Sequence, residues 1–359
     1  MANRQFRLID LIDDMRDGKD VLFQSVRYVK DMMTYDVKTL TLDDTIETCL
    51  KIMKANKIRH IPVVDIATEE KGKQYFVGIV SQRDVFRQIS PYLGKVGEED
   101  SDLKALKQPL AQIVTRKPKS VSPETKIQDM ITIMVDNHVD SVPVLIDGNL
   151  VGIATAADTL KLFARLESIG QLCREKTTME PGRGFVDLLS GDSDHMVLAL
   201  SSVLRTVKDI MTEQVICLRE QDNLVKVMDV MQQGKFRHVP IVDKQKKLVG
   251  IISDRDVLRH LPFRGRQRQP KTELFRAGLF DVDLNEPVML KPTNSIMKRD
   301  VIHVGPGCSF YDAVKMLHEM SISCLPVTDD EKNILGIVTV TDIMRGLLAA
   351  YALFEKTMA

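Results

Sequence analysis

Hydrophobic residues recur with helical spacing in the segment "TIETCLKIMKANK". Its apolar side chains follow the i, i+3, i+4, i+7 pattern of one helix face at Ile46, Cys49, Leu50 and Met53. The following runs "HIPVVD" and "YFVGIVS" are short and rich in β-branched or aromatic residues, so they predict strands. The proline in the first run indicates an edge or strand-start position. "RDVFRQI" then returns to a helical pattern, and with a leading strand the predicted order is strand, helix, strand, strand, helix.

The same order occurs four times, so internal repetition is the main feature of the sequence. The four segments begin with "VKDMMTYD", "LAQIVTRK", "VKDIMTEQ" and "NSIMKRD". Each closes on Gly, two apolar residues, Ser or Thr, two variable residues and Asp. The first two repeats map onto the last two at a nearly constant shift, from Pro62 to Pro240 and from Pro143 to Pro326. The sequence therefore predicts two halves with two repeats in each.

These repeats resemble CBS (cystathionine β-synthase) domains, which pair into Bateman modules. The marks are the Met-Thr pair or its variant that opens each repeat, the proline after an apolar residue, and the closing Gly-x-x-Ser/Thr-x-x-Asp. The resemblance implies an α+β fold with four CBS repeats (β-α-β-β-α) paired into two Bateman modules. We expect the repeats at residues 29–90, 108–166, 206–262 and 293–350. The remaining expected parts are an N-terminal helical leader at 1–28, a linker with the helical leader of the second half at 167–205, and an inter-repeat connection at 263–292.

The closing motif places polar groups where a strand passes into a helix. In the first repeat Ser81 ends the strand and Asp84 lies on the first helical turn. A hydroxyl and backbone N–H groups at a positive helix terminus suit an anion, and a carboxylate there can accept hydrogen bonds from ribose hydroxyls. The same Ser/Thr-x-x-Asp pattern is close to a capping box, which stabilises a helix without any ligand. Both interpretations are open at this point.

The family resemblance implies a role for this motif in every repeat. The residues implied to hold the ribose of an adenine nucleotide are Asp84, Asp158, Asp256 and Asp342. Their implied partners near the phosphate are Ser81, Thr155, Ser253 and Thr339.

The two residues in a fixed slot before the proline separate odd repeats from even ones. In repeats one to four this slot holds, in order, Arg59-His60, Asp140-Ser141, Arg237-His238 and Ser323-Cys324. An arginine fork can bind two phosphate oxygens at once, so we expect the stronger nucleotide sites around the odd repeats. We expect Asp140 to repel the same anion, and its replacement to leave binding unchanged or to improve it. The alternative is that these arginines are solvated surface residues.

Two further positions are candidates for contacts with a nucleotide. Arg83 and Arg255 stand beside the expected ribose ligands, either as phosphate contacts or as partners of surface carboxylates. One aligned position on the leading strand is expected to line a base pocket, namely Thr39, Ser120, Cys217 and His303. The bulk of His303 makes a site in repeat four weak or empty.

Composition limits the classes of partner. Lys+Arg and Asp+Glu are both 50, for a formal net charge of +0, so the bulk charge favours neither nucleic acid nor an acidic membrane and any anion site is local. The 5 cysteines lack a CxxC spacing, which fits reduced thiols, and no run approaches the roughly 18 apolar residues of a membrane span. We therefore expect a soluble cytoplasmic protein without nucleic-acid or membrane partners.

Catalytic motifs are missing from the sequence. His318-Glu319 lacks the second histidine of a zincin, and GxxxxGK[ST], GxSxG and GxGxxG do not occur. We expect no enzyme, no metal and no cofactor, but a regulatory protein that binds AMP, ADP or ATP between paired repeats and signals to an effector protein by conformational change. The alternatives are a ligand-free interaction scaffold, or a binder of another adenosyl ligand such as S-adenosylmethionine or a cyclic dinucleotide. The expected assembly is a homodimer, or a disc closed within one chain by its two halves.

Overall fold

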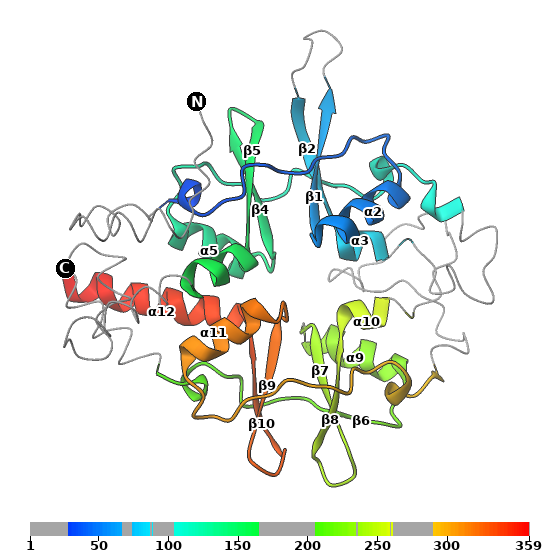
Figure 1. Cartoon of the computed structure of the whole chain (residues 1–359), viewed down its shortest axis with the longest axis vertical. Coiled ribbons are helices and arrows are strands. Elements are labelled where there is room, and N and C mark those ends of the chain that lie inside the picture. Colours follow the sequence, from blue (N-terminus) through cyan, green and yellow to red (C-terminus); the bar gives the residue numbers. More distant parts are fainter. Residues whose placement is uncertain are drawn as a thin grey trace.

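Figure 1 shows the computed structural model of the chain, which describes residues 28–66, 74–86, 88, 104–164, 205–234, 236–258, 260 and 290–358. The expected leader, linker and inter-repeat connection lie outside these residues, apart from a few positions at their ends. The described parts form an α+β fold of four similar units arranged around a centre (Figure 1).

The four units follow one order of elements. Repeat one contains α2 (Ile46–Asn56), β1 (His60–Ile66), β2 (Gln74–Ser81) and α3 (Gln82–Phe86). Repeat two contains β3 (Thr115–Arg116), α5 (Ile127–Asp136), β4 (Ser141–Ile146), β5 (Asn149–Thr155) and a helix over 156–164. Repeat three contains β6 (Leu218–Arg219), α9 (Leu224–Gly234), β7 (His238–Val242), β8 (Leu248–Ser253) and α10 (Asp254–Leu258). Repeat four contains α11 (Phe310–Glu319), β9 (Cys324–Thr328), β10 (Ile334–Thr339) and α12 (Val340–Met358). Short 3-10 turns open the repeats at Val29–Asp31, Leu110–Gln112, Val207–Asp209 and Thr293–Ser295.

The expected leading strand of each repeat is very short. In repeat three it is β6, which pairs in parallel with β7, and in the other repeats it is a single parallel bridge such as Leu40 with Val63. The bridge explains why proline is tolerated in the neighbouring strand. Leu40 N–H donates to the Pro62 carbonyl, and Val64 N–H donates to the Leu40 carbonyl, so the pairing uses the oxygen of Pro62 and needs no N–H from it.

Each pair of repeats is tied together by crossed strands. The segment that opens one repeat pairs with the second hairpin strand of the neighbouring repeat. Examples are Thr34 with Ile153 and Lys298 with Ile251. The glycine of the closing motif makes this approach possible, because a Cβ at Gly78 would stand 2.3 Å from the Thr115 carbonyl oxygen. The two repeats of a half therefore fold as one module.

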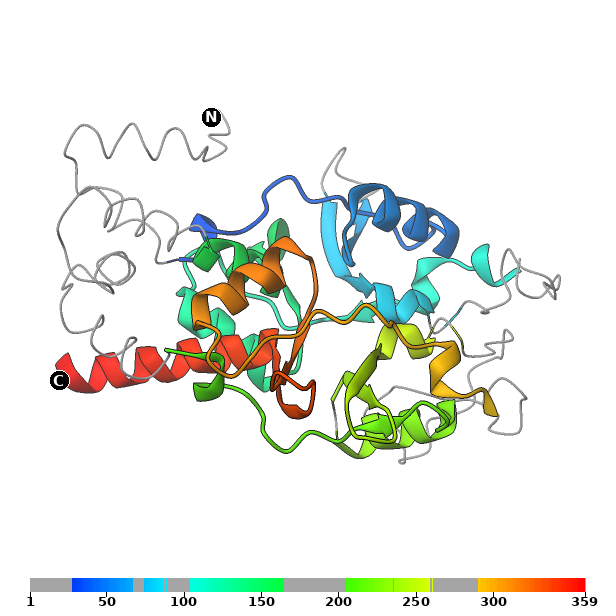
Figure 2. The ribbon, with the colours of Figure 1, turned by 60° about the horizontal axis from the view of Figure 1, so that its bottom comes forward.

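The two modules close a disc within one chain. Figure 1 places repeat one opposite repeat three, and repeat two opposite repeat four. Between repeats two and four the contact is apolar, because α12 packs on α5 and Met344 of α12 belongs to the core cluster of repeat two. In Figure 2 the same helix leaves the disc beside the fourth repeat and ends at the C-terminus. Between repeats one and three, α3 faces α10 and the contact is largely polar. Of the assemblies that the sequence allowed, the structure shows the disc closed within one chain.

Candidate ligand-binding cleft

A cavity of about 390 Å³ lies where repeats one, three and four meet. Repeat three contributes the end of β8 and the start of α10, including Ser253 and Asp256. Repeat four contributes its opening segment, between Lys298 and Ile302, and the start of β9. Repeat one contributes the end of α2. Because residues of both modules line it, a ligand in this cavity would contact both halves of the chain.

The closing motif forms a capping box in the cavity wall. Asp256 Oδ2 accepts hydrogen bonds from Ser253 N at 3.0 Å and from Ser253 Oγ at 2.5 Å, and Asp256 N donates back to Ser253 Oγ at 3.4 Å. The other carboxylate oxygen, Oδ1, lies 3.9 Å from Lys298 Nζ. The box engages Oδ2, whereas Oδ1 lies near the lysine, so the two carboxylate oxygens have different neighbours.

The same box recurs in the other three repeats. Equivalent bonds join Ser81 to Asp84, Thr155 to Asp158, and Thr339 to Asp342. A helix-capping function is therefore sufficient to account for the motif in every repeat.

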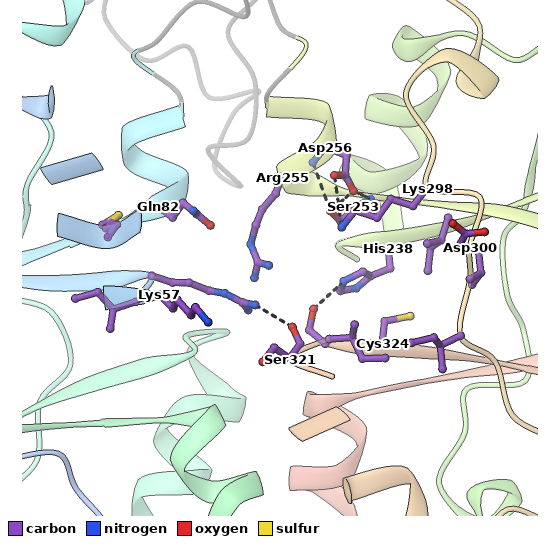
Figure 3. Close-up of a pocket in the computed structure, with 18 of the residues that line it drawn as sticks. Lys57, Gln82, His238, Ser253, Arg255, Asp256, Lys298, Asp300, Ser321 and Cys324 are labelled. Carbon is purple, nitrogen blue, oxygen red and sulfur yellow. Dashed lines mark hydrogen bonds and ion pairs between the residues drawn. The ribbon is translucent and has the colours of Figure 1, made fainter. Parts of the chain in front are cut away.

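Positive charge dominates the cavity. Its cationic side chains are Lys54, Lys57, Arg59, Arg255 and Lys298, against the carboxylates of Asp256 and Asp300. Figure 3 shows Arg255 extending into the cavity between Gln82 and His238. Burial and repulsion from Arg59 and Arg83 lower the pKa of Arg255 to about 10. Within the described residues no carboxylate forms an ion pair with Arg255, so its charge is poorly compensated.

Two histidines near the disc centre are neutral. Burial lowers the pKa of His60 to about 4 and that of His238 to about 4, with nearby arginines acting in the same direction. His238 Nε2 lies 3.0 Å from Ser323 Oγ, which joins repeat three to repeat four across the cavity. At neutral pH these rings can serve as hydrogen-bond partners but add no charge.

A second group of charges, formed by Arg83, Arg237, Asp140 and Asp254, is paired. Asp140 accepts from Arg237 Nη1 at 2.8 and 2.6 Å, and from the two terminal nitrogens of Arg83 at 3.2 Å. Arg83 Nε also donates to Asp254 Oδ2 at 2.5 Å. Burial opposes these charges, but Asp254 and Asp140 outweigh it and raise the pKa of Arg83. The charge of Asp140 is thus bound by two arginines, and its repulsion of a ligand anion stays a prediction.

The structure brings part of the expected set to one cavity. Of the expected ligand-binding residues, the cavity wall contains Arg59, His238, Ser253, Arg255 and Asp256. The others do not line it: His60, Thr39, Ser81, Arg83, Asp84, Thr155, Asp158, Arg237, Thr339 and Asp342. The binding role of each expected residue stays a prediction.

The cavity also has lining residues that the sequence did not predict. The opening segment of repeat four contributes Lys298, Asp300, Val301 and Ile302. Its pairing with β8, through Lys298 and Ile251, brings it beside the closing motif of repeat three. The leading-strand position expected to line the base pocket, His303, instead lies with Nδ1 3.0 Å from Thr328 Oγ1. The sequence alignment of the repeats gave no sign of this crossing between neighbours.

Metal-ligand clusters and membrane-spanning helices are both absent from the described parts of the chain. No group of three or more His, Cys, Asp or Glu residues there could hold a metal ion. Among the described helices, none is both long and apolar enough to cross a bilayer.

Comparison with known families identifies the class of protein. The CBS domain matches at residues 29–91, 110–165, 207–262 and 294–349, which together make up more than half of the chain. The protein therefore belongs to the CBS domain family, with four CBS domains in two modules.

Individual relatives are similar in organisation. The protein MJ1404 of Methanocaldococcus jannaschii is 26% identical over 320 residues, a match that covers 88% of this chain and 61% of MJ1404. The chain thus spans about 61% of the length of that relative. The crystal structure of MJ1225 from the same organism, described as a candidate archaeal homologue of g-AMPK, aligns with a TM-score of 0.60 and 21% identity over 89% of this chain and 99% of MJ1225. The crystal structure of a conserved protein of Pyrococcus horikoshii aligns with a TM-score of 0.50 and 20% identity. The alignment covers 90% of this chain and 99% of that protein's chain. These likenesses establish the shared fold.

Proposed function

We propose that this protein is a non-catalytic sensor that binds a phosphate-bearing adenine nucleotide, AMP, ADP or ATP, in the cavity where repeats one, three and four meet. The observation that carries the proposal is the pairing, in one cavity, of a carboxylate at a helix start with poorly compensated arginines. Asp256 lies on the first turn of α10 in the cavity wall, and Arg255 and Arg59 line the same cavity. This is the polarity of a nucleotide, which offers hydroxyls at the ribose and negative charge at the phosphate.

The walls of the cavity suit the three parts of such a ligand. The Asp256 carboxylate can accept hydrogen bonds from ribose hydroxyls. The apolar side chains of Ile251, Val301 and Ile302 provide a surface for a flat base. Arg255 and Arg59 supply charged donors for phosphate oxygens.

The charge of the cavity discriminates between adenosyl ligands. S-adenosylmethionine carries a sulfonium cation, which the lysines and arginines of the wall would repel. A cyclic dinucleotide carries one negative charge on each of two separate phosphodiesters, so a single cluster of cations meets less charge than at a terminal phosphate. AMP, ADP and ATP carry terminal phosphates of higher charge and are therefore favoured.

Binding at this place gives a physical route to a signal. The cavity wall joins repeat one of the first module to both repeats of the second, so a bound nucleotide would favour one relative position of the modules. We include in the proposal that an effector protein reads this position, and that two chains associate as a homodimer.

A scaffold without a ligand is the second candidate, because the four capping boxes form without one. Isothermal titration calorimetry with AMP, ADP, ATP, 2′-deoxy-AMP and S-adenosylmethionine separates the two. We expect binding of the ribonucleotides, and at least tenfold weaker binding of 2′-deoxy-AMP, because a hydrogen bond to a charged group contributes about 1.5–3 kcal/mol. Folded protein that binds none of these ligands at millimolar concentration would overturn the proposed nucleotide sensor and favour the scaffold.

A matched pair of variants tests the assignment of the site. Asp256→Asn keeps the shape of the capping residue but weakens acceptance from ribose, so AMP affinity should fall about tenfold or more. Asp158→Asn makes the same change in the box of repeat two, outside the cavity, and should bind AMP as the wild type does. Loss of binding in Asp158→Asn with normal binding in Asp256→Asn would move the site to another repeat.

A further inference from the structure

The two modules place equivalent residues on opposite sides of the disc centre. Arg237 Nη2 donates to the His138 carbonyl at 2.6 Å, and Arg59 Nη2 donates to the Ser321 carbonyl at 3.1 Å. The two bonds are equivalent, since Arg59 aligns with Arg237 and His138 aligns with Ser321 in the repeats. One runs from the second module to the first, and the other from the first module to the second. The disc centre therefore holds two comparable groups of residues that face each other.

The two groups differ in their carboxylates. On one side, Arg83 and Arg237 meet Asp140 and Asp254. On the other, Arg255 and Arg59 occupy the equivalent places, but the slot of Asp254 holds Gln82 and that of Asp140 holds Ser323. The cavity lies on the side where both carboxylates are replaced by neutral side chains.

The pKa shifts of the two equivalent arginines follow this difference. Although burial opposes its charge, the carboxylates of Asp254 and Asp140 raise the pKa of Arg83. Burial together with like charges lowers the pKa of its counterpart Arg255. Identical side chains in equivalent places thus have a complete anionic partner on one side and an incomplete one on the other.

We propose that Asp140 and Asp254 together form a built-in anion. On the side of repeats one and two they occupy the place that a ligand phosphate occupies on the side of repeats three and four. Asp140 is then a specificity-determining residue that limits the chain to one central anion site. The placing of a phosphate at Arg255 and Arg59 rests on the proposed function, whereas the internal anion is seen in the contacts of Arg83 and Arg237. A simple clasp between modules is the competing explanation, and it predicts no exchange between the carboxylates and a free anion.

The first experiment removes the built-in anion with Asp140→Ser/Asp254→Gln, which installs the residues of the equivalent slots. Inorganic pyrophosphate is the probe, in thermal unfolding and calorimetry at constant ionic strength. We expect the variant to melt below the wild type in chloride buffer, to regain most of the loss in millimolar pyrophosphate, and to bind one more pyrophosphate per chain than the wild type. The control Asp136→Ser/Asp229→Gln removes two exposed carboxylates and should bind as the wild type does. A destabilised variant that pyrophosphate does not rescue, with unchanged stoichiometry, would establish the clasp.

If the double variant does not fold, Asp140→Ser alone gives the same readouts, because Asp254 then still pairs with Arg83. We expect it to bind the additional pyrophosphate as well, and an unchanged stoichiometry would overturn the proposal.

The reciprocal experiment adds an internal anion to the open side with Gln82→Asp/Ser323→Asp. This variant should fold normally and lose at least tenfold in AMP or pyrophosphate affinity, and unchanged affinity would overturn the proposal. The two conclusions are separable. If the wild type binds no nucleotide, the proposed function fails, while rescue of Asp140→Ser/Asp254→Gln by pyrophosphate still supports the internal anion.

Discussion

At the scale of single residues, burial near the disc centre decides which side chains carry charge. His60 and His238 align in the two modules, and both have a pKa lowered to about 4. The arginines beside them keep their protons because the pKa of a guanidinium is far above neutrality even when it is lowered. The centre thus combines neutral rings with permanent cations, which favours anions over metal ions.

The neutral histidines make stability depend on pH in a defined window. An unfolded histidine takes up a proton near pH 6.5, whereas the folded one resists it down to about 4, so the unfolded state binds more protons between these values. Stability is therefore fully present above pH 6.5 and is lost as the pH falls toward 4. We expect urea unfolding to show a loss of about 1–2 kcal/mol per histidine between pH 7 and pH 5.

A pair of variants isolates this contribution. His238→Asn should reduce the slope of stability against pH between 7 and 5, whereas His138→Asn, at an exposed histidine, should leave it unchanged. The carboxylates of Asp140 and Asp254 also have lowered pKa values, so they contribute to acid unfolding below this range. Equal slopes in the wild type and His238→Asn would contradict the assignment.

Among the secondary-structure elements, the glycine of the closing motif lies in the second hairpin strand. The opening segment of the neighbouring repeat packs directly against this glycine. A Cβ at Gly250 would meet Met297 Sδ at 2.4 Å, and one at Gly336 would meet Met211 Sδ at 2.7 Å. At Gly78 the obstacle is backbone, the Thr115 carbonyl oxygen, which cannot turn aside as a methionine side chain can. Sequence shows these glycines as a motif, and the crossed strands explain them.

This geometry predicts the cost of adding one methyl group. Gly78→Ala would push β2 away from β3, and we expect a loss of about 1–3 kcal/mol in unfolding free energy, as for other overpacked sites. Gly307→Ala is the control, because no atom lies within 4 Å of a Cβ there. Equal urea midpoints for the two variants would show that the crossing can adjust.

At the scale of the whole molecule, the two sides of the disc are held by different forces. Repeats two and four share apolar surface, since α12 contributes Leu347 to the core of repeat four and Met344 to that of repeat two. Repeats one and three meet through Arg83 and Asp254, with Leu50 packed against both cores. The apolar contact between repeats two and four holds the modules together by burial. The polar contact between repeats one and three lies beside the cavity.

Opening the apolar side should separate the modules. Met344→Glu places a charge at a side chain that is 2% exposed, where an unpaired carboxylate is strongly unfavourable. Small-angle scattering should then show a larger radius of gyration than that of the wild type. Met320→Glu makes the same change at a residue that is 52% exposed and should leave the radius unchanged. An unchanged radius in Met344→Glu would mean that the polar side closes the disc without α12.

Local spacing in the sequence is enough to predict the repeats and their elements. The helical spacing around Ile46 and the short runs at "HIPVVD" and "YFVGIVS" became α2, β1 and β2. The closing motif was readable as a capping box, which the structure contains in all four repeats. These features depend on residues that lie a few positions apart, so local spacing is enough to specify them.

Which charges are compensated depends instead on how the disc closes. Arg237 and Asp140 are 97 positions apart, Arg83 and Asp254 are 171 apart, and Arg59 and Ser321 are 262 apart. The arginines before the proline look equivalent in sequence, yet closure of the disc gives Arg237 a carboxylate and leaves Arg59 with a carbonyl. The physical reason is that Coulomb and hydrogen-bond energies depend on distance in space, which closure of the disc sets and the order of residues along the chain does not.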